Sequence, residues 1–261
     1  MKRAYVDLPY GQMHYRYCGE GKPLIMVHMS GGYSAQFENV SEYLKSKYTV
    51  YAIDLFGYGF SDKQHHGKKR FSITEHAQSI LDFMDAMNIE RTSIYGTLVG
   101  SNCCARAAIM QPGRFEKLIL CQPIYNEDYN TLRNILANFK DIPLARDGEH
   151  MLEMWRRANR AHPEYSPEIS QWRADAYVIS GRSCETMHHA MHDEEDWTTV
   201  YPQIKVPTIV IAIELYPTTP QVKLAAKLIP NAELDFYPQS KLYVEVENPK
   251  LVSEVILKHL P

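Results

Sequence analysis

The stretch "IYGTLVGSN" (residues 94–102) decides how the chain folds. The apolar run "TSIYG" (92–96) predicts a buried strand, and a helix is expected to follow it through Met110. Gly96 and Gly100 stand where a sharp turn between such a strand and helix needs glycines, and this type of turn commonly presents a serine nucleophile at its apex. The apex residue here is Leu98. The stretch therefore predicts the backbone of a nucleophile turn without the nucleophile.

The same alternation of strands and helices extends over most of the chain. Strands are expected at 3–8, 12–18, 23–28, 49–55, 92–96, 116–121, 207–213 and 232–238. Helices are expected at about 36–46, 71–89, 218–229 and 248–260, besides the one ending near Met110, and Ser72 with Glu75 predicts a capping box. This order indicates an α/β fold with a mostly parallel, eight-stranded sheet and helices on both faces.

Residues 124–203 interrupt this alternation. The segment is rich in Trp, Met, Arg and His at helical spacings and contains no strong buried strand. We interpret it as a helical cap inserted into a core formed by residues 1–123 and 204–261. Because ligands of open α/β sheets bind beyond the carboxyl ends of the strands, the cap is expected to cover the binding site.

Composition limits the classes of partner. The net charge is -3, and the one basic cluster, "HHGKKR" (65–70), is interpreted as a solvated loop, so no nucleic-acid partner is expected. Five cysteines without a C-x-x-C pair favour a reducing compartment. The N-terminus lacks the apolar region of a secretory signal, and no apolar run is long enough to span a bilayer. A cytoplasmic monomer or homodimer without a membrane partner is expected.

Five segments, in order, resemble the α/β-hydrolase fold superfamily. They are "LIMVHMSGG" (24–32), "DLFGYGFSD" (54–62), "YGTLVGS" (95–101), "VPTIVIAIELYPTTP" (206–220) and "YVEVENP" (243–249). The resemblance implies a serine, an acid and a histidine, assisted by two backbone N–H donors. The apex of the turn is Leu98, the acid position before the proline is Tyr216, and the histidine position is Leu242. The triad is therefore predicted to be degenerate, and hydrolysis through an acyl-enzyme is predicted to be absent.

A relocated triad is the third alternative for function. Thr97 and Ser101 carry hydroxyl groups near the apex. Glu127 and Asp128 could supply an acid from the end of the earlier strand, whereas Glu214 is out of place by two residues. The C-terminal segment offers only one histidine, His259, in the last helix, so no general base can be placed.

The predicted pocket lies above the turn. The N–H of Val99 and a donor near Met29 or Ser30 could still point into it, because backbone donors do not depend on side chains. Tyr33, Tyr125, Tyr216 and Tyr243 could donate hydrogen bonds to a bound carbonyl. The predicted ligand-binding residues are His28, Met29, Ser30, Tyr33, Leu98, Val99, Tyr125, Tyr216 and Leu242.

The segment "SCETMHHAMHDEEDW" (183–197) contains further candidate metal ligands and acid or base residues. In a helix, Cys184, His188 and His192 share one face, which is compatible with zinc, with Glu195 nearby. A polar cap helix without metal is the preferred interpretation, and no cofactor is expected. Alternatively, His188 or His192, or His28 in the loop after the third strand, could act as acid or base above an apolar pocket.

Two functions from different classes follow. The first is a pseudoenzyme that binds a small, largely apolar ligand between core and cap, as a sensor or carrier. The alternative is a non-hydrolytic enzyme, such as a lyase, decarboxylase, isomerase or cyclase, that uses cap histidines and pocket tyrosines.

Overall fold

A computed structural model describes the chain except for residues 64–69, 141, 162–164, 182–185, 194–195 and 261. Its centre is one sheet of eight strands in the order β1-β2-β4-β3-β5-β6-β7-β8. β1 (Lys2–Leu8) and β2 (Gly11–Cys18) form an antiparallel hairpin, and β2 pairs antiparallel with β4 (Tyr48–Ile53). All other neighbours are parallel: β3 (Lys22–Val27), β5 (Thr92–Thr97), β6 (Phe115–Cys121), β7 (Thr208–Ile213) and β8 (Glu233–Tyr237). The predicted α/β fold and mostly parallel sheet are confirmed.

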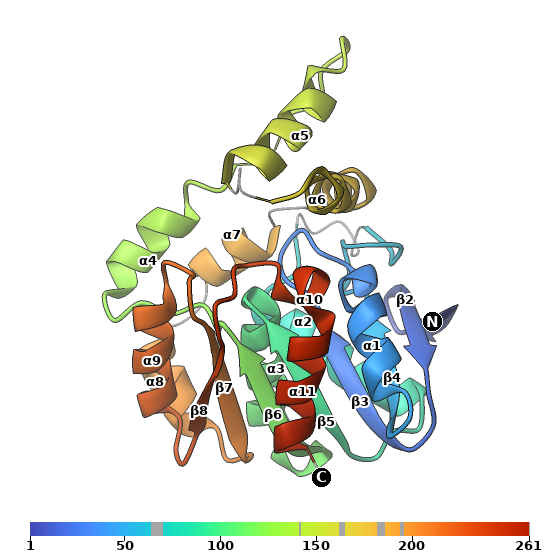
Figure 1. Ribbon diagram of the computed structural model, residues 1–261, viewed down its shortest axis with the longest axis vertical. Helices are drawn as coiled ribbons and strands as arrows, with labels where there is room; N and C mark the ends of the chain where they lie inside the picture. Colours follow the sequence, from blue (N-terminus) through green and yellow to red (C-terminus); the bar gives the residue numbers. More distant parts are fainter. Residues whose placement is uncertain (64–69, 141, 162–164, 182–185, 194–195, 261) are drawn as a thin grey trace.

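Helices cover both faces of the sheet (Figure 1), and each face has its own apolar core. α2 (Ile73–Ala86), α3 (Val99–Met110) and α9 (Thr219–Leu228) pack on one face. η1 (Ser34–Phe37), α1 (Glu38–Leu44), α10 (Val244–Glu247) and α11 (Pro249–His259) pack on the other. η2 (Pro112–Arg114) leads into β6.

The start of α2 shows how local sequence sets a helix boundary. Ser72 accepts the Glu75 N–H at 3.1 Å through its hydroxyl, and the Ser72 N–H donates to the Glu75 carboxylate at 2.9 Å. The predicted capping box is therefore confirmed.

The chain between β6 and β7 forms a group of helices. They are α4 (Tyr129–Leu136), α5 (Glu149–Ala161), α6 (Pro167–Ser180), α7 (Thr186–Asp193), α8 (Trp197–Val200) and η4 (Tyr201–Gln203). The described part of 124–203 contains no strand. Figure 1 shows α4, α5, α6 and α7 above one end of the sheet, with α5 projecting away from the body of the molecule. Within the described residues, no helix is long and apolar enough to cross a membrane.

Candidate functional site

The turn between β5 and α3 keeps the strained backbone of a nucleophile turn. The backbone of Leu98 has φ 50° and ψ -124°, a combination that residues other than glycine rarely adopt. A Cβ at Gly100 would collide with the backbone carbonyl of His28, and one at Gly96 would collide with Gly100. Both glycines are thus needed for close approach, and the turn persists although holding a leucine in it costs about 1–3 kcal/mol.

The structure brings together the three positions that the sequence places in the site. Leu98 and Leu242 lie in one buried apolar cluster with Met29 and Tyr243, and Tyr216 packs against it. Burial raises the pKa of the Tyr216 hydroxyl, so this group is a hydrogen-bond donor rather than an anion. The side chains at the apex and around it form an apolar floor.

A cavity of about 520 Å³ lies above this floor, lined by residues from the ends of the strands and from the chain between α4 and α7. Six predicted ligand-binding residues line it, namely Met29, Ser30, Leu98, Tyr125, Tyr216 and Leu242. His28, Tyr33 and Val99 are not among its lining residues. The chain from α4 to α7 contributes further lining residues, among them Leu132, Leu136, Phe139, Lys140, Glu153, Arg157, Arg173, Tyr177 and His188.

His28 braces the loop after β3. Its Nδ1 lies 2.8 Å from the Met29 carbonyl, and its Nε2 lies 3.1 Å from the Leu55 N–H, which donates to it. Nδ1 therefore carries the proton, and the ring is neutral. Burial lowers the pKa of His28. With both ring nitrogens bonded to the backbone, His28 holds the loop that carries Met29 and does not face the cavity.

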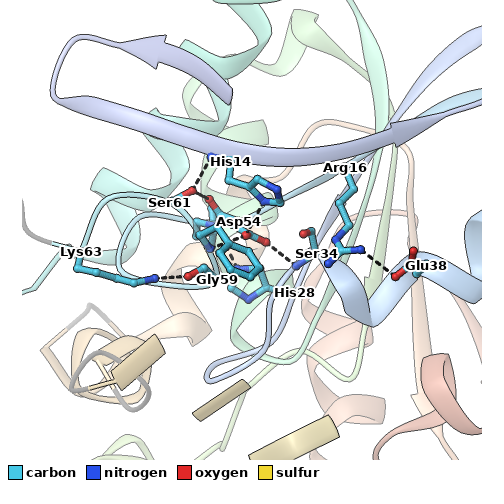
Figure 2. A network of polar contacts seen from close by, with 11 residues as sticks. His14, Arg16, His28, Ser34, Glu38, Asp54, Gly59, Ser61 and Lys63 are labelled. Carbon is cyan, nitrogen blue, oxygen red and sulfur yellow. Dashed lines mark hydrogen bonds and ion pairs between the residues drawn. The ribbon is translucent and has the colours of Figure 1, made fainter. Parts of the chain in front are cut away.

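A buried carboxylate, Asp54, ties this loop to the neighbouring turn (Figure 2). Its oxygens accept hydrogen bonds from the Ser34 N–H at 2.5 Å, the Phe60 N–H at 2.8 Å and the His14 ring at 2.8 Å. Burial by itself raises the pKa of Asp54, but the hydrogen bonds from His14 and Phe60 hold it below its ordinary value. Gly59 has φ 50°, and a Cβ atom at this position would overlap the Asp54 carboxylate.

Arg173, on α6, places a positive charge on the cavity wall. The residue is buried, and its guanidinium donates to the carbonyls of Ser30 and Gly31 and to the Tyr177 hydroxyl at 3.0 Å. Its centre lies 4.2 Å from the centre of the Tyr177 ring. The sequence analysis missed Arg173. The only signal was a single arginine four residues before a tyrosine on a cap helix, and this does not show which way the helix faces.

The cap histidines separate in space. His188 lines the cavity and stacks on Phe139, with ring centres 3.9 Å apart. His192 is not a lining residue and contacts Asp193 at 2.9 Å. Cys184 and Glu195 lie outside the described residues. Among the residues that are described, no group of three or more His, Cys, Asp or Glu side chains is placed to hold a metal ion.

The hydroxyl groups considered for a relocated nucleophile do not line the cavity. Ser101 directs its hydroxyl at the backbone carbonyls of Gly96 and Cys121, at 2.7 and 2.9 Å, beneath the turn. Thr97 is buried at the end of β5.

The acids and the base considered for a relocated triad also lie elsewhere. Asp128 caps α4 and accepts the Asn130 N–H at 3.0 Å, and Glu127 is exposed. Glu214 accepts the Gln239 N–H at 2.7 Å. His259 pairs with Asp235 of β8 at 2.7 Å. None of these four side chains is among the lining residues of the cavity.

The chain belongs to the α/β hydrolase fold family, whose model matches residues 22–240. It is 31% identical over 219 residues to a 2-hydroxy-6-oxo-6-phenylhexa-2,4-dienoate hydrolase of Comamonas testosteroni, covering 67% of this chain and 76% of that protein. A cis-3-alkyl-4-alkyloxetan-2-one decarboxylase of Shewanella oneidensis is 24% identical over 149 residues, covering 55% of this chain and 43% of that protein.

The solved structure of a hydrolase from Pseudomonas aeruginosa PA01 superposes with a TM-score of 0.79. The match covers 98% of this chain and 97% of that chain at 18% identity, and so it shows the fold alone.

Proposed function

We propose that the protein binds a small, largely apolar carboxylate between core and cap, as a sensor or carrier, and does not hydrolyse esters or amides through an acyl-enzyme. The observation that carries this proposal is the cavity itself. The three triad positions in its floor carry two leucines and a tyrosine, and Arg173 supplies a buried positive charge on its wall.

The first part of the proposal concerns missing chemistry. Leu98 offers no hydroxyl to attack a carbonyl, Leu242 offers no base to take a proton, and Tyr216 offers no carboxylate to orient one. Because loss of the serine or histidine alone removes nearly all triad-dependent rate, three replacements together support a degenerate triad and a pseudoenzyme.

The second part concerns the ligand. An apolar body suits the floor, where burial of apolar surface supplies the binding free energy. Three cations and one carboxylate are among the lining residues, namely Lys140, Arg157, Arg173 and Glu153, and this surplus favours an anion. The Comamonas relative is named for a dienoate that carries a phenyl group, which combines the same two features.

Ester hydrolysis is expected to be undetectable. Purified protein should neither turn over a nitrophenyl butyrate nor become labelled by a serine-directed fluorophosphonate, whereas an active serine esterase assayed in parallel should do both. The single variant Leu98→Ser should remain inactive toward the ester, because Leu242 still provides no base. Turnover by the wild type, with one labelled site, would contradict the proposal.

Carboxylate binding is expected to depend on Arg173. Calorimetric titration with 6-phenylhexanoate should give at least about tenfold tighter binding than titration with 6-phenylhexan-1-ol, since a charge-assisted hydrogen bond contributes about 1.5–3 kcal/mol. In Arg173→Gln, the affinity for 6-phenylhexanoate should fall to the affinity for 6-phenylhexan-1-ol. Arg173→Lys should still bind the carboxylate more tightly than the alcohol. If the wild-type protein binds the carboxylate and the alcohol with equal affinity, the proposal that its ligand is an anion is wrong. Thermal melting of each variant controls for folding, because Arg173 also bonds the loop after β3.

The non-hydrolytic enzyme remains a second candidate. It is favoured by His188, which lines the cavity, and by the tyrosines around it, Tyr125, Tyr177, Tyr216 and Tyr243. The similarity to a decarboxylase is compatible with chemistry that needs no nucleophile. Mass spectrometry of ligands recovered after incubation separates the two candidates, since a carrier returns its ligand unchanged.

A further inference from the structure

The outward side of α5 carries an apolar patch. Met151, Leu152 and Trp155 are 45%, 52% and 38% exposed, although they are large apolar side chains on consecutive turns of one helix. Met154, three residues after Met151 and on a neighbouring side of α5, is buried with Ile142 and Tyr177. Figure 1 shows that α5 projects from the body of the molecule. Clustered apolar residues of this kind mark interaction surfaces.

Two opposite charges border the patch. Glu149 and Arg156 are seven residues apart, so they lie on the same edge of the helix, two turns from each other. Their side chains are 51% and 50% exposed, and they pair with each other within the chain. Glu149 lies toward the start of α5, and Arg156 lies toward its end. We call Glu149, Met151, Leu152, Trp155 and Arg156 the α5 outer face.

We propose that the α5 outer face binds the same face of a second copy of the chain, with the two helices antiparallel about a two-fold axis. In an antiparallel copy, Arg156 lies at the height at which the first helix carries Glu149. Glu149 then faces Arg156 of the second copy, and Arg156 faces its Glu149. This register is centred between Leu152 and Glu153.

The apolar residues require nearly the same register as the charges. With the axis at this centre, Leu152 lies against Leu152 of the second copy. Trp155 lies against Met151 of the second copy, and the converse contact repeats on the other side of the axis. Charge pairing and apolar pairing therefore agree to within one residue, as an isologous two-fold interface demands. An anionic lipid surface would meet Glu149 together with Arg156, so the alternating charges favour a second copy over a membrane.

Charge exchange tests this dimer. Sedimentation of the full chain over a concentration series should show self-association to twice the monomer mass. Glu149→Arg alone, or Arg156→Glu alone, should weaken it at least about tenfold, because each places like charges opposite each other. The double variant Glu149→Arg/Arg156→Glu should associate like the wild type, and a mixture of the two single variants should form a heterodimer. Glu254→Arg, an exposed charge reversal on α11, serves as the matched control and should change nothing.

Three outcomes would overturn the proposal. One is a wild-type chain that stays monomeric at every concentration. Another is a dimer that both single variants leave intact, which would place the interface elsewhere. The third is a monomer that binds anionic vesicles through α5, shown by loss of vesicle binding in Trp155→Ala. Circular dichroism of each variant verifies the fold, and because the exchanged side chains are half exposed, their replacement leaves the core untouched.

Discussion

Asp54→Ala is expected to lower the free energy of unfolding by about 3–5 kcal/mol, because each hydrogen-bond donor left without its acceptor in the interior costs about 1–3 kcal/mol. The alanine takes away the acceptor for two buried donors, the His14 ring and the Ser34 N–H, and for the partly buried Phe60 N–H. Each donor left without a partner adds its own desolvation cost. Urea denaturation at neutral pH measures the change.

A matched control lies in the same turn. Asp62 accepts the Gln12 N–H at 2.8 Å, but it is exposed, so water replaces the lost acceptor in Asp62→Ala. This variant should lose less than about 1 kcal/mol. If Asp54→Ala is as mild as Asp62→Ala, the Asp54 carboxylate does not hold the two loops together.

The same variant should weaken ligand binding under conditions where it remains folded. The Ser34 N–H bond to Asp54 fixes the loop that begins with Met29 and Ser30, and both of these residues line the cavity. Loss of that bond leaves the loop held by the His28 brace and by the hydrogen bonds that Arg173 donates to it. The structural role of Asp54 and the proposed function of the cavity are thus linked through one backbone segment.

The sheet and the centre of the site could be predicted because their signals are local. Buried parallel strands are apolar runs, and the resemblance to the α/β-hydrolase fold then assigns Leu98, Tyr216 and Leu242 to one place. The strain at Leu98 also follows from its place between two glycines that admit no side chain.

The cap could not be predicted to the same depth. The helical periodicity of 124–203 indicates helices but not the direction in which each one faces, because packing against the core decides that. Arg173 was missed for this reason, and it is the residue on which the proposal of an anionic ligand rests. His188 and His192 share a helical face by spacing, yet only His188 is among the lining residues. His28 was a candidate acid or base until its two backbone hydrogen bonds were located, and no sequence pattern encodes those.

A histidine that the sequence analysis did not single out should control stability in mild acid. His76, on α2, is 1% exposed, and neither ring nitrogen has a hydrogen-bond partner in the part of the chain that is described. Its ring stacks on Phe71 with centres 5.3 Å apart. Burial, reinforced by nearby His28, lowers the pKa of His76 from 6.5 to about 3.

The sign of the effect follows from proton binding. Between about pH 6.5 and pH 3 the unfolded chain binds a proton at His76 that the folded chain does not bind. The stability contributed by the neutral ring is therefore present above pH 6.5 and is lost as the pH falls through this window. At about 1.4 kcal/mol per pH unit, the loss between pH 6.5 and 4.5 is about 2–3 kcal/mol.

His76→Phe should remove this loss, because phenylalanine keeps the stacked ring and cannot be protonated. Urea denaturation at pH 7 and pH 4.5 should show a drop in unfolding free energy that is about 2–3 kcal/mol smaller in His76→Phe than in the wild type. His150→Phe, at a partly exposed position of α5, should leave the wild-type drop unchanged. The Asp54 pKa is also depressed, but its contribution is lost as the pH falls below its ordinary value of 3.8, which lies outside the measured interval from pH 7 to 4.5. Equal acid sensitivity of the wild type and His76→Phe would show that the folded protein accommodates a charged ring at this position.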